Sequence, residues 1–401
     1  MGGTHADTSR IGWARALGAG AFLACSWTWV IGMFLPVILV REFGVWGWVA
    51  FAVPNVLGAM AMGVVLRGRG AAAGRAAALG GGPTLFSAIT LAFHAFFLTW
   101  LGGWALAPVL GVWATPALSI AVFALGWAVS QGGWGAWRRA APMVWCGSVV
   151  LALLTWMTAH ESMHAPAWSG ASPPGDLLWL APVMVFGFAL CPYLDLTFLR
   201  ARREESGATG TAAFVIGFGA LFLAMITFTL LYAPMWLGRG VSYYVVVHIT
   251  MQSAFTVGAH LRELRVRERA TLVGAGSIAW TALLAGVLLG LAAGIVGASG
   301  REFAPGETLY KCFMGAYGLL LPALVWAWSA GGRVWDGPTR WAAAGVTVIA
   351  APMFWLGFIE QRWAWLAPGL LVALLAPLVA RGLRHARARA GGSVVGPPSN
   401  L

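Results

Sequence analysis

The hydrophobic residues of this chain occur in long runs separated by short polar segments. Twelve runs are long enough to cross a bilayer as helices, at about 20 residues per crossing. They lie near residues 17–40, 44–66, 84–105, 108–130, 141–159, 177–199, 211–234, 241–260, 270–297, 307–329, 339–358 and 363–380. The pattern therefore predicts an all-α polytopic membrane protein of about twelve transmembrane helices, with no room for a soluble domain.

Composition supports this prediction and limits the possible classes of protein. Of the 401 residues, 60% are hydrophobic and 9% are charged, whereas an ordinary soluble protein has about 25% charged residues. The four cysteines, Cys25, Cys146, Cys191 and Cys312, lie in apolar runs and are expected as small buried residues rather than a disulfide framework. The first apolar run continues to Val40, which is too long for a cleaved signal peptide.

The net charge of +12 becomes informative once it is mapped onto the loops. With the N-terminus in the cytoplasm, 20 of the 25 Lys and Arg residues fall in inner segments. The other five, in or beside outer segments, are Arg41, Arg239, Arg301, Lys311 and Arg362. Positive residues concentrate on the cytoplasmic side, so the chain is expected as a multi-pass inner-membrane protein with both termini cytoplasmic. The charge reflects orientation in the lipid bilayer and does not indicate a nucleic-acid partner.

Two apolar runs are interrupted at similar places. Gly32 and Pro36 interrupt the first run, and Gly187 and Pro192 interrupt the sixth. Inverted repeats of five helices would pair helix 1 with helix 6, and such paired interruptions occur in secondary transporters. The alternative is that Gly and Pro are simply common in membrane helices. The expected segments are a cytoplasmic N-terminus (1–16), a first five-helix repeat (17–165), a second (166–330), two additional helices (331–380) and a basic disordered cytoplasmic tail (381–401).

Three short stretches resemble a known family. Residues 26–32 (SWTWVIG), 42–48 (EFGVWGW) and 54–58 (PNVLG) are similar to the first two repeat helices of sodium:solute symporters. More broadly, the chain resembles the amino acid, polyamine and organocation transporter superfamily, with its five-plus-five inverted-repeat fold. The resemblance implies a substrate site between helices 1, 3, 6 and 8, and often a sodium site between helices 1 and 8.

Polar residues within the apolar runs are costly in a membrane and are therefore candidates for function. One face of helix 8 and one face of helix 3 carry them at helical spacing. They are His248, Gln252, Thr256 and His260, with Ser253 beside them, and Ser87, Thr90 and His94. They could form a polar pathway, or join neighbouring helices through hydrogen bonds worth about 0.6 kcal/mol each. His260 is expected at the membrane interface.

Two further charged groups have alternative interpretations. Asp195 could bind a cation or a proton, or it could pair with Arg200 near the inner surface. Lys311 follows Glu307 by four residues, which favours a structural helix pair at the outer end of helix 10. Stacking on a substrate is possible for Trp27, Trp29 and Tyr193, although packing and interface anchoring are the usual roles of tryptophan.

These residues define the candidate sites. The predicted substrate-binding residues are Ser26, Trp27, Trp29, Gly32, His94, Cys191, Tyr193, His248 and Gln252. The predicted ion- or proton-coupling residues are Asp195, Ser253 and Thr256. No cofactor is expected beyond sodium or a proton as the coupling ion.

One motif indicates different chemistry. His160, Glu161 and His164 form an HExxH string, which on a helix presents two imidazoles to zinc and a carboxylate as general base. Asp176 is a possible third ligand on the outer side. Asp195 is not, because the topology separates it from His160 by most of a membrane about 30 Å thick.

The sequence therefore favours a secondary transporter that moves a small organic solute, one that could carry a carboxylate, by alternating access. Half-helix dipoles at the interruptions of helices 1 and 6 would face the solute. Two alternatives stay open at this point. One is an outer-face zinc hydrolase, and the other is a membrane sensor or assembly subunit that does not transport.

Overall fold

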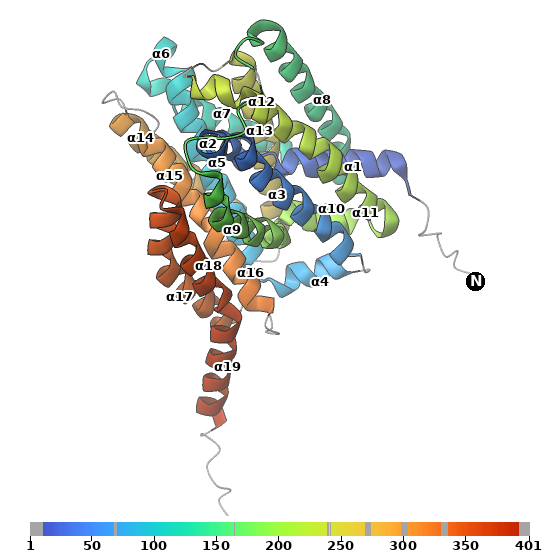
Figure 1. Ribbon diagram of the computed structural model, residues 1–401. Helices are drawn as coiled ribbons and strands as arrows, with labels where there is room; N and C mark the ends of the chain where they lie inside the picture. Colours follow the sequence, from blue (N-terminus) through green and yellow to red (C-terminus); the bar gives the residue numbers. More distant parts are fainter. Residues whose placement is uncertain are drawn as a thin grey trace, which may run out of the picture.

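The computed structural model describes residues 11–67, 70–163, 165–238, 240, 242–268, 274–297, 304–329 and 336–392. Within these ranges every regular element is a helix, which confirms the all-α prediction. Figure 1 shows the helices as one bundle, with α6 (Ala107–Leu110) and α4 (Ala71–Ala78) near opposite ends of it.

The first half of the chain supplies helices 1 to 5. Helix 1 is split into two elements, and helices 2, 3, 4 and 5 are α3, α5, α7 and α8. The bounds are α1 (Trp13–Trp27), α2 (Val30–Phe43), α3 (Val45–Val65), α5 (Gly82–Ala105), η1 (Val112–Ala114), α7 (Ala117–Val129) and α8 (Trp134–Ala159).

The second half supplies helices 6 to 12. The bounds are η2 (Pro174–Asp176), α9 (Leu177–Leu190), η3 (Cys191–Leu194), α10 (Leu196–Glu204), α11 (Gly207–Ile216), η4 (Gly217–Phe222), α12 (Leu223–Leu237), α13 (Tyr243–Glu268), α14 (Ala275–Gly297), α15 (Ala304–Gly315), η5 (Ala316–Leu320), α16 (Leu321–Ser329), α17 (Gly337–Phe354), η6 (Trp355–Ile359), η7 (Trp363–Trp365), α18 (Leu366–Leu374) and α19 (Ala376–Gly392). Helix 6 is α9 with α10, helix 8 is α13, and helix 10 is α15 with α16.

Ten helices of the described chain are long and apolar enough to cross a membrane, and α1 with α2 makes an eleventh. The remaining predicted crossing, residues 241–260, is occupied by α13, whose polar stripe and charged end lower its hydropathy. The protein is therefore a multi-pass membrane protein. The total of twelve crossings and the cytoplasmic position of the termini stay predictions.

The contacts that helices 1 to 5 make correspond to the contacts that helices 6 to 10 make. Helix 1 corresponds to helix 6, helix 2 to helix 7, and so on through the set. α3 packs on α9 as α11 packs on α1, and α5 packs on α14 as α13 packs on α7. α8 packs on α1 as α16 packs on α9. This correspondence fits a five-plus-five repeat, although the boundaries at residues 165 and 330 stay predictions.

Glycines allow the closest of these approaches. A Cβ added at Gly58 of α3 would collide with the carbonyl of Phe188 on α9. A Cβ at Gly286 of α14 would collide with the carbonyl of Ala92 on α5. Small residues let membrane helices pack backbone to backbone, so these positions fix the spacing of the bundle.

Helix 1 is interrupted, but four residues earlier than expected. α1 ends at Trp27 and α2 begins at Val30, with Trp29 in an extended conformation and a bend of 59° between the two parts. Gly32 and Pro36 lie inside α2, so they do not make the break.

The second interruption falls within helix 6. α9 ends at Leu190, a short 3-10 turn contains Pro192, and Asp195 adopts an extended conformation before α10 begins. Gly187 lies inside α9 rather than in the break. Helices 1 and 6 are therefore both discontinuous, as expected, although of the predicted Gly and Pro residues only Pro192 lies in a break.

The C-terminal helices lie outside the paired set. Figure 1 shows α17 and α18 at one edge of the bundle and α19 projecting beyond it. The predicted disordered tail begins at residue 381, but α19 continues to Gly392, so that part of the prediction is wrong. Residues 393–401 lie outside the described residues.

Candidate functional site

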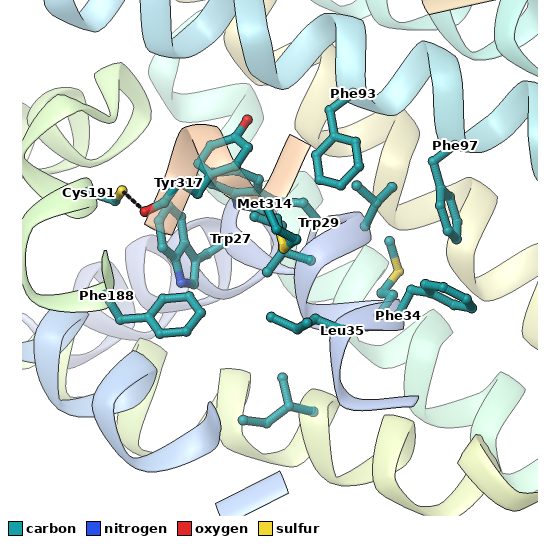
Figure 2. Close-up of a cluster of buried hydrophobic side chains, with 14 of the residues drawn as sticks. Trp27, Trp29, Phe34, Leu35, Phe93, Phe97, Phe188, Cys191, Met314 and Tyr317 are labelled. Carbon is teal, nitrogen blue, oxygen red and sulfur yellow. Dashed lines mark hydrogen bonds between the residues drawn. The ribbon is translucent and has the colours of Figure 1, made fainter. Parts of the chain in front are cut away.

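A cavity of about 350 Å³ lies where the two interrupted helices meet. Trp27, Trp29 and Gly32 line it from helix 1, and Gly187 and Cys191 line it from helix 6. Helix 2, helix 10, helix 11 (α17 with η6) and Leu366 at the start of α18 complete the wall. In Figure 2 the side chains of Trp27, Phe188, Leu35, Met314 and Tyr317 gather around the helix 1 break.

The cavity is closed on one side and open on the other. The lining residues of helices 1, 2 and 6 are buried. On helices 10 and 11, by contrast, Cys312, Ala351 and Trp355 are exposed. These exposed lining residues lie on α15, α17 and η6, and the lining also includes residues of η5; η5 and η6 are both π-helical turns. Such turns are rare and often lie at functional sites.

The lining of the cavity is mainly apolar and aromatic, with a few polar groups. The indole nitrogen of Trp27 donates to Asn55 Oδ1 at 2.6 Å, and Cys191 Sγ donates to the Tyr317 carbonyl at 3.2 Å. Thr347 Oγ1 has no partner among the described residues. The N-terminal end of α2 and the C-terminal end of α9 also border the cavity, so backbone dipoles of opposite sign face it.

An ionic group lies at one end of the cavity. Lys311, which lines the cavity, pairs with Glu307 Oε1 at 3.0 Å, as the spacing predicted. Arg41 holds both oxygens of Glu307 at 2.7 Å, and its Nε donates to Glu42 at 2.8 Å. Gln361 donates to Glu42 as well. Two cations therefore face two carboxylates, and the group presents no net charge to the cavity.

Four of the predicted substrate-binding residues line this cavity, namely Trp27, Trp29, Gly32 and Cys191. The other five are not among the lining residues. They are Ser26, His94, Tyr193, His248 and Gln252. The resemblance implied a site between helices 1, 3, 6 and 8, whereas the lining comes from helices 1, 2, 6, 10 and 11 and from Leu366 of α18.

Several lining residues escaped the sequence analysis. Asn55, Thr347 and Tyr317 are polar residues within apolar runs, and the rule that singled out His94 could have found them. Phe188 and Met314 gave no such signal, because an apolar residue in an apolar run is unremarkable.

The predicted coupling residues lie deeper in the bundle. Asp195 is fully buried and caps α10, since its Oδ1 accepts the Thr197 backbone N–H at 2.7 Å. Its Oδ2 has no partner among the described residues. Arg200 pairs with Glu263 at 2.6 Å rather than with Asp195. Ser26 accepts a hydrogen bond from Thr197 Oγ1 at 3.2 Å.

The polar stripe of helix 8 faces the inside of the bundle. Ser148 of α8 contacts both His248 and Gln252, at 3.1 and 2.7 Å. Thr256 donates to the Cys25 carbonyl at 3.2 Å, and Ser253 Oγ has no partner within the described chain. These contacts match the interhelical alternative at three positions and leave one hydroxyl unpaired.

His94 and His260 come together around the helix 1 break. Both are 0% exposed, and the expected position of His260 at the membrane interface stays a prediction. Their ring centroids lie 6.4 and 6.3 Å from that of Trp29. Tyr193, by contrast, is half-buried near the guanidinium of Arg75, 5.9 Å away.

The HExxH string does not lie on a helix in its described part. α8 ends at Ala159, and His160 and Glu161 are exposed in the turn that follows. His164 lies outside the described residues, and Asp176 is in the 3-10 turn before α9. Because His160 lies outside the helix, the string lacks the helical spacing that brings two imidazoles to one zinc ion.

Comparison with solved structures identifies the fold. A manganese transporter from Eremococcus coleocola, in complex with an aromatic bis-isothiourea substituted compound, aligns with a TM-score of 0.53 over 96% of this chain and 95% of its own, at 12% identity. The chain has the fold of this membrane transporter.

Two structures of Mhp1, a nucleobase-cation-symport-1 family transporter, give TM-scores of 0.49. The closed form with bromovinylhydantoin bound is 16% identical and covers 92% of both chains. The inward-facing form is 15% identical and covers 93% of this chain and 91% of its own. No protein-family model matches the sequence. A search of curated proteins finds no match either.

Proposed function

We propose that this protein is a secondary transporter, not an enzyme, that moves a small organic solute across the inner membrane by alternating access. The observation that carries the proposal is the cavity at the paired breaks of helices 1 and 6. Discontinuous helices place free backbone groups beside a solute and allow the half-helices to move. The transporter fold of the chain supports the same conclusion.

The lining favours a neutral and mainly apolar solute that contains a ring. Trp27, Phe188 and Tyr317 offer aromatic surfaces against which a ring can pack. Lys311, which would otherwise attract a carboxylate, is already paired with Glu307. A charged solute would have to enter without a free counter-ion in the described wall, which is costly in a low-dielectric site. This proposal replaces the carboxylate-bearing solute that the sequence suggested.

A polar group on the solute would be held by the helix ends. The free N–H groups at the start of α2 can donate to it, and the last carbonyls of α9 can accept from it. An amide carries both a donor and an acceptor. Manganese, which the structural neighbour's name specifies, prefers oxygen ligands, and no Asp or Glu is among the described lining residues.

Binding of three matched compounds tests the proposal. Phenylacetamide, phenylacetate and phenethylamine share a ring and differ in charge. We expect phenylacetamide to raise the thermal unfolding temperature of the purified protein in detergent. At equal concentration, the two ions should give about tenfold less stabilisation. Equal stabilisation by all three would contradict the solute class.

Two glycine substitutions test the site itself. Gly315 lines the cavity and Gly345 does not, and a Cβ at either would meet no atom within 4 Å. We expect Gly315→Phe to fill the cavity and abolish both phenylacetamide binding and its exchange in proteoliposomes. Gly345→Phe should retain both. Equal behaviour of the two variants would exclude this cavity as the transport site.

A further inference from the structure

Three ring nitrogens around the helix 1 break have no hydrogen-bond partner among the described residues. They are Trp29 Nε1 from helix 1, His94 Nε2 from helix 3 and His260 Nε2 from helix 8. Trp29 is 1% exposed and both histidines are 0% exposed. Buried polar atoms almost always have a partner, so three together need an explanation such as a bound water, ion or proton.

The histidines are fixed by their other nitrogens. His94 Nδ1 lies 2.7 Å from the Thr90 carbonyl, which can only accept, so Nδ1 carries the hydrogen in the neutral ring. Nε2 of His94 is therefore a lone pair. His260 Nδ1 lies 3.0 Å from Ser87 Oγ. Each imidazole is thus held at Nδ1, and in His94 the free Nε2 is the nitrogen that can take a proton.

We propose that His94 and His260 form the proton-binding site that couples proton movement to solute transport. The proposal rests on the transport function above and names its coupling ion. Neither histidine lines the cavity, but Trp29 does, and Trp29 contacts both rings. The break of helix 1 therefore has the solute on one side and the two histidines on the other.

Other titratable groups lie on the elements packed around this pair. Tyr317 is the one most directly involved, because its ring lies 5.2 Å from that of Trp29 and its hydroxyl is 3.0 Å from Thr90 Oγ1. The others on neighbouring elements are Cys25, Cys191, Tyr193, Asp195 and Tyr310, with the ion-paired groups Arg200 with Glu263 and Glu307 with Lys311 at the two ends. Asp195 already uses one oxygen to cap α10.

Protonation changes what the site can bind. A proton taken from water at one face of the membrane converts the lone pair of His94 into an N–H donor and makes the ring cationic. A water molecule between the rings could accept from Trp29 Nε1 and donate to the neutral His94 Nε2. After protonation both nitrogens are donors, so that bridge is lost. The cation needs more hydration than the closed site offers. The break at Trp29 therefore opens, and the proton leaves to the other face when the site closes again.

Nuclear magnetic resonance of the whole protein labelled with ¹⁵N-histidine tests proton binding directly, in the absence of any solute. We expect His94 at pH 8 to show the Nδ1–H tautomer. Lowering the pH to 4.5 should protonate His94 or His260. If both buried rings stay neutral at pH 4.5, the proposal is overturned.

Cysteine alkylation tests the coupling. Cys191 lines the cavity and is buried, whereas Cys146 is exposed, does not line the cavity and corrects for the effect of pH on thiol reactivity. We expect the ratio of Cys191 to Cys146 alkylation by N-ethylmaleimide to rise about fivefold or more between pH 8 and pH 5.5. His94→Gln should reduce the rise to below about twofold, and His385→Gln should leave it unchanged.

Two results would contradict the coupling. One is a ratio that does not change with pH, and the other is a full response in His94→Gln. Because the ¹⁵N measurement uses the unmodified protein, poor folding of a variant does not remove the test, and His260→Asn provides a second variant. Both readouts work without a transported solute, so failure of solute exchange in proteoliposomes would contradict the transport function while leaving the proton site testable.

Discussion

The carboxylate of Glu205 joins three helices at the end of the bundle opposite the Lys311 group, and its removal should be costly. Arg15 of α1 binds Oε2 at 2.8 Å, and Arg138 of α8 binds Oε1 at 3.1 Å. The indole nitrogen of Trp134 donates to Oε1 at 3.1 Å. Glu205 itself follows directly after α10. One buried side chain therefore ties helix 1, helix 5 and helix 6 together.

The magnitude follows from the exposure of each partner. The Glu205 side chain is 1% exposed, and breaking a fully buried ion pair costs about 3–5 kcal/mol. The side chains of Arg15 and Arg138 are 58% and 29% exposed, so water can replace part of what they lose. We therefore expect Glu205→Gln to lower the free energy of unfolding by about 2 kcal/mol.

Glu204→Gln is the matched control. Glu204 is the preceding residue, 41% exposed, and its 3.6 Å pair with Arg200 is a surface pair worth about 0–1 kcal/mol. Unfolding titrations of both variants in mixed micelles give the two free energies. A double mutant with Arg15→Gln isolates the pair, and we expect a coupling energy of about 1 kcal/mol. Equal losses in Glu204→Gln and Glu205→Gln would refute the reasoning.

Substitutions at three other positions should change the stability of the protein by different amounts. Gly58→Ala should push α3 from the Phe188 carbonyl and cost about 1–3 kcal/mol in the same titration, whereas Gly345→Ala, which meets no atom, should cost none. Asp195→Asn keeps a capping oxygen and should unfold like the unmodified protein, whereas Asp195→Ala should lose about 1 kcal/mol; equal losses would exclude the cap. Arg41→Lys cannot hold both oxygens of Glu307, so thermal unfolding should begin at a lower temperature; an unchanged transition would contradict a structural role for the bidentate pair.

The helical architecture could be predicted because the membrane imposes it. Every backbone polar group in lipid needs an internal partner, so apolar runs of this length become helices. Charged residues from the segments predicted to be cytoplasmic also lie close to one another. Arg15 and Arg138 bind Glu205, Arg200 binds Glu263, and all five lie in segments expected on one side. Amphipathicity had little part in this, since lipid and neighbouring helices are equally apolar.

The position of the cavity could not be predicted in the same way. Trp27 and Cys191 were among the predicted substrate-binding residues, but the contribution of helices 10 and 11 depends on how separate parts of the chain pack. Lys311 was recognised as half of an ion pair, and the sequence did not show that the pair lies at one end of the cavity. Its second cation, Arg41, lies 266 residues from Glu307 along the chain. No local spacing rule reaches that far.

The break of helix 1 shows why local signals alone misplace an interruption. Pro36 lacks the N–H that would bind the carbonyl of Gly32, and such a loss normally weakens a helix. Here Thr229 of α12 donates to that carbonyl at 3.1 Å, so α2 continues through the proline. At the actual break, the Thr256 hydroxyl of α13 donates to the Cys25 carbonyl at 3.2 Å. The helix therefore ends where side chains satisfy its last carbonyls, and it continues where a neighbouring helix supplies the missing donor.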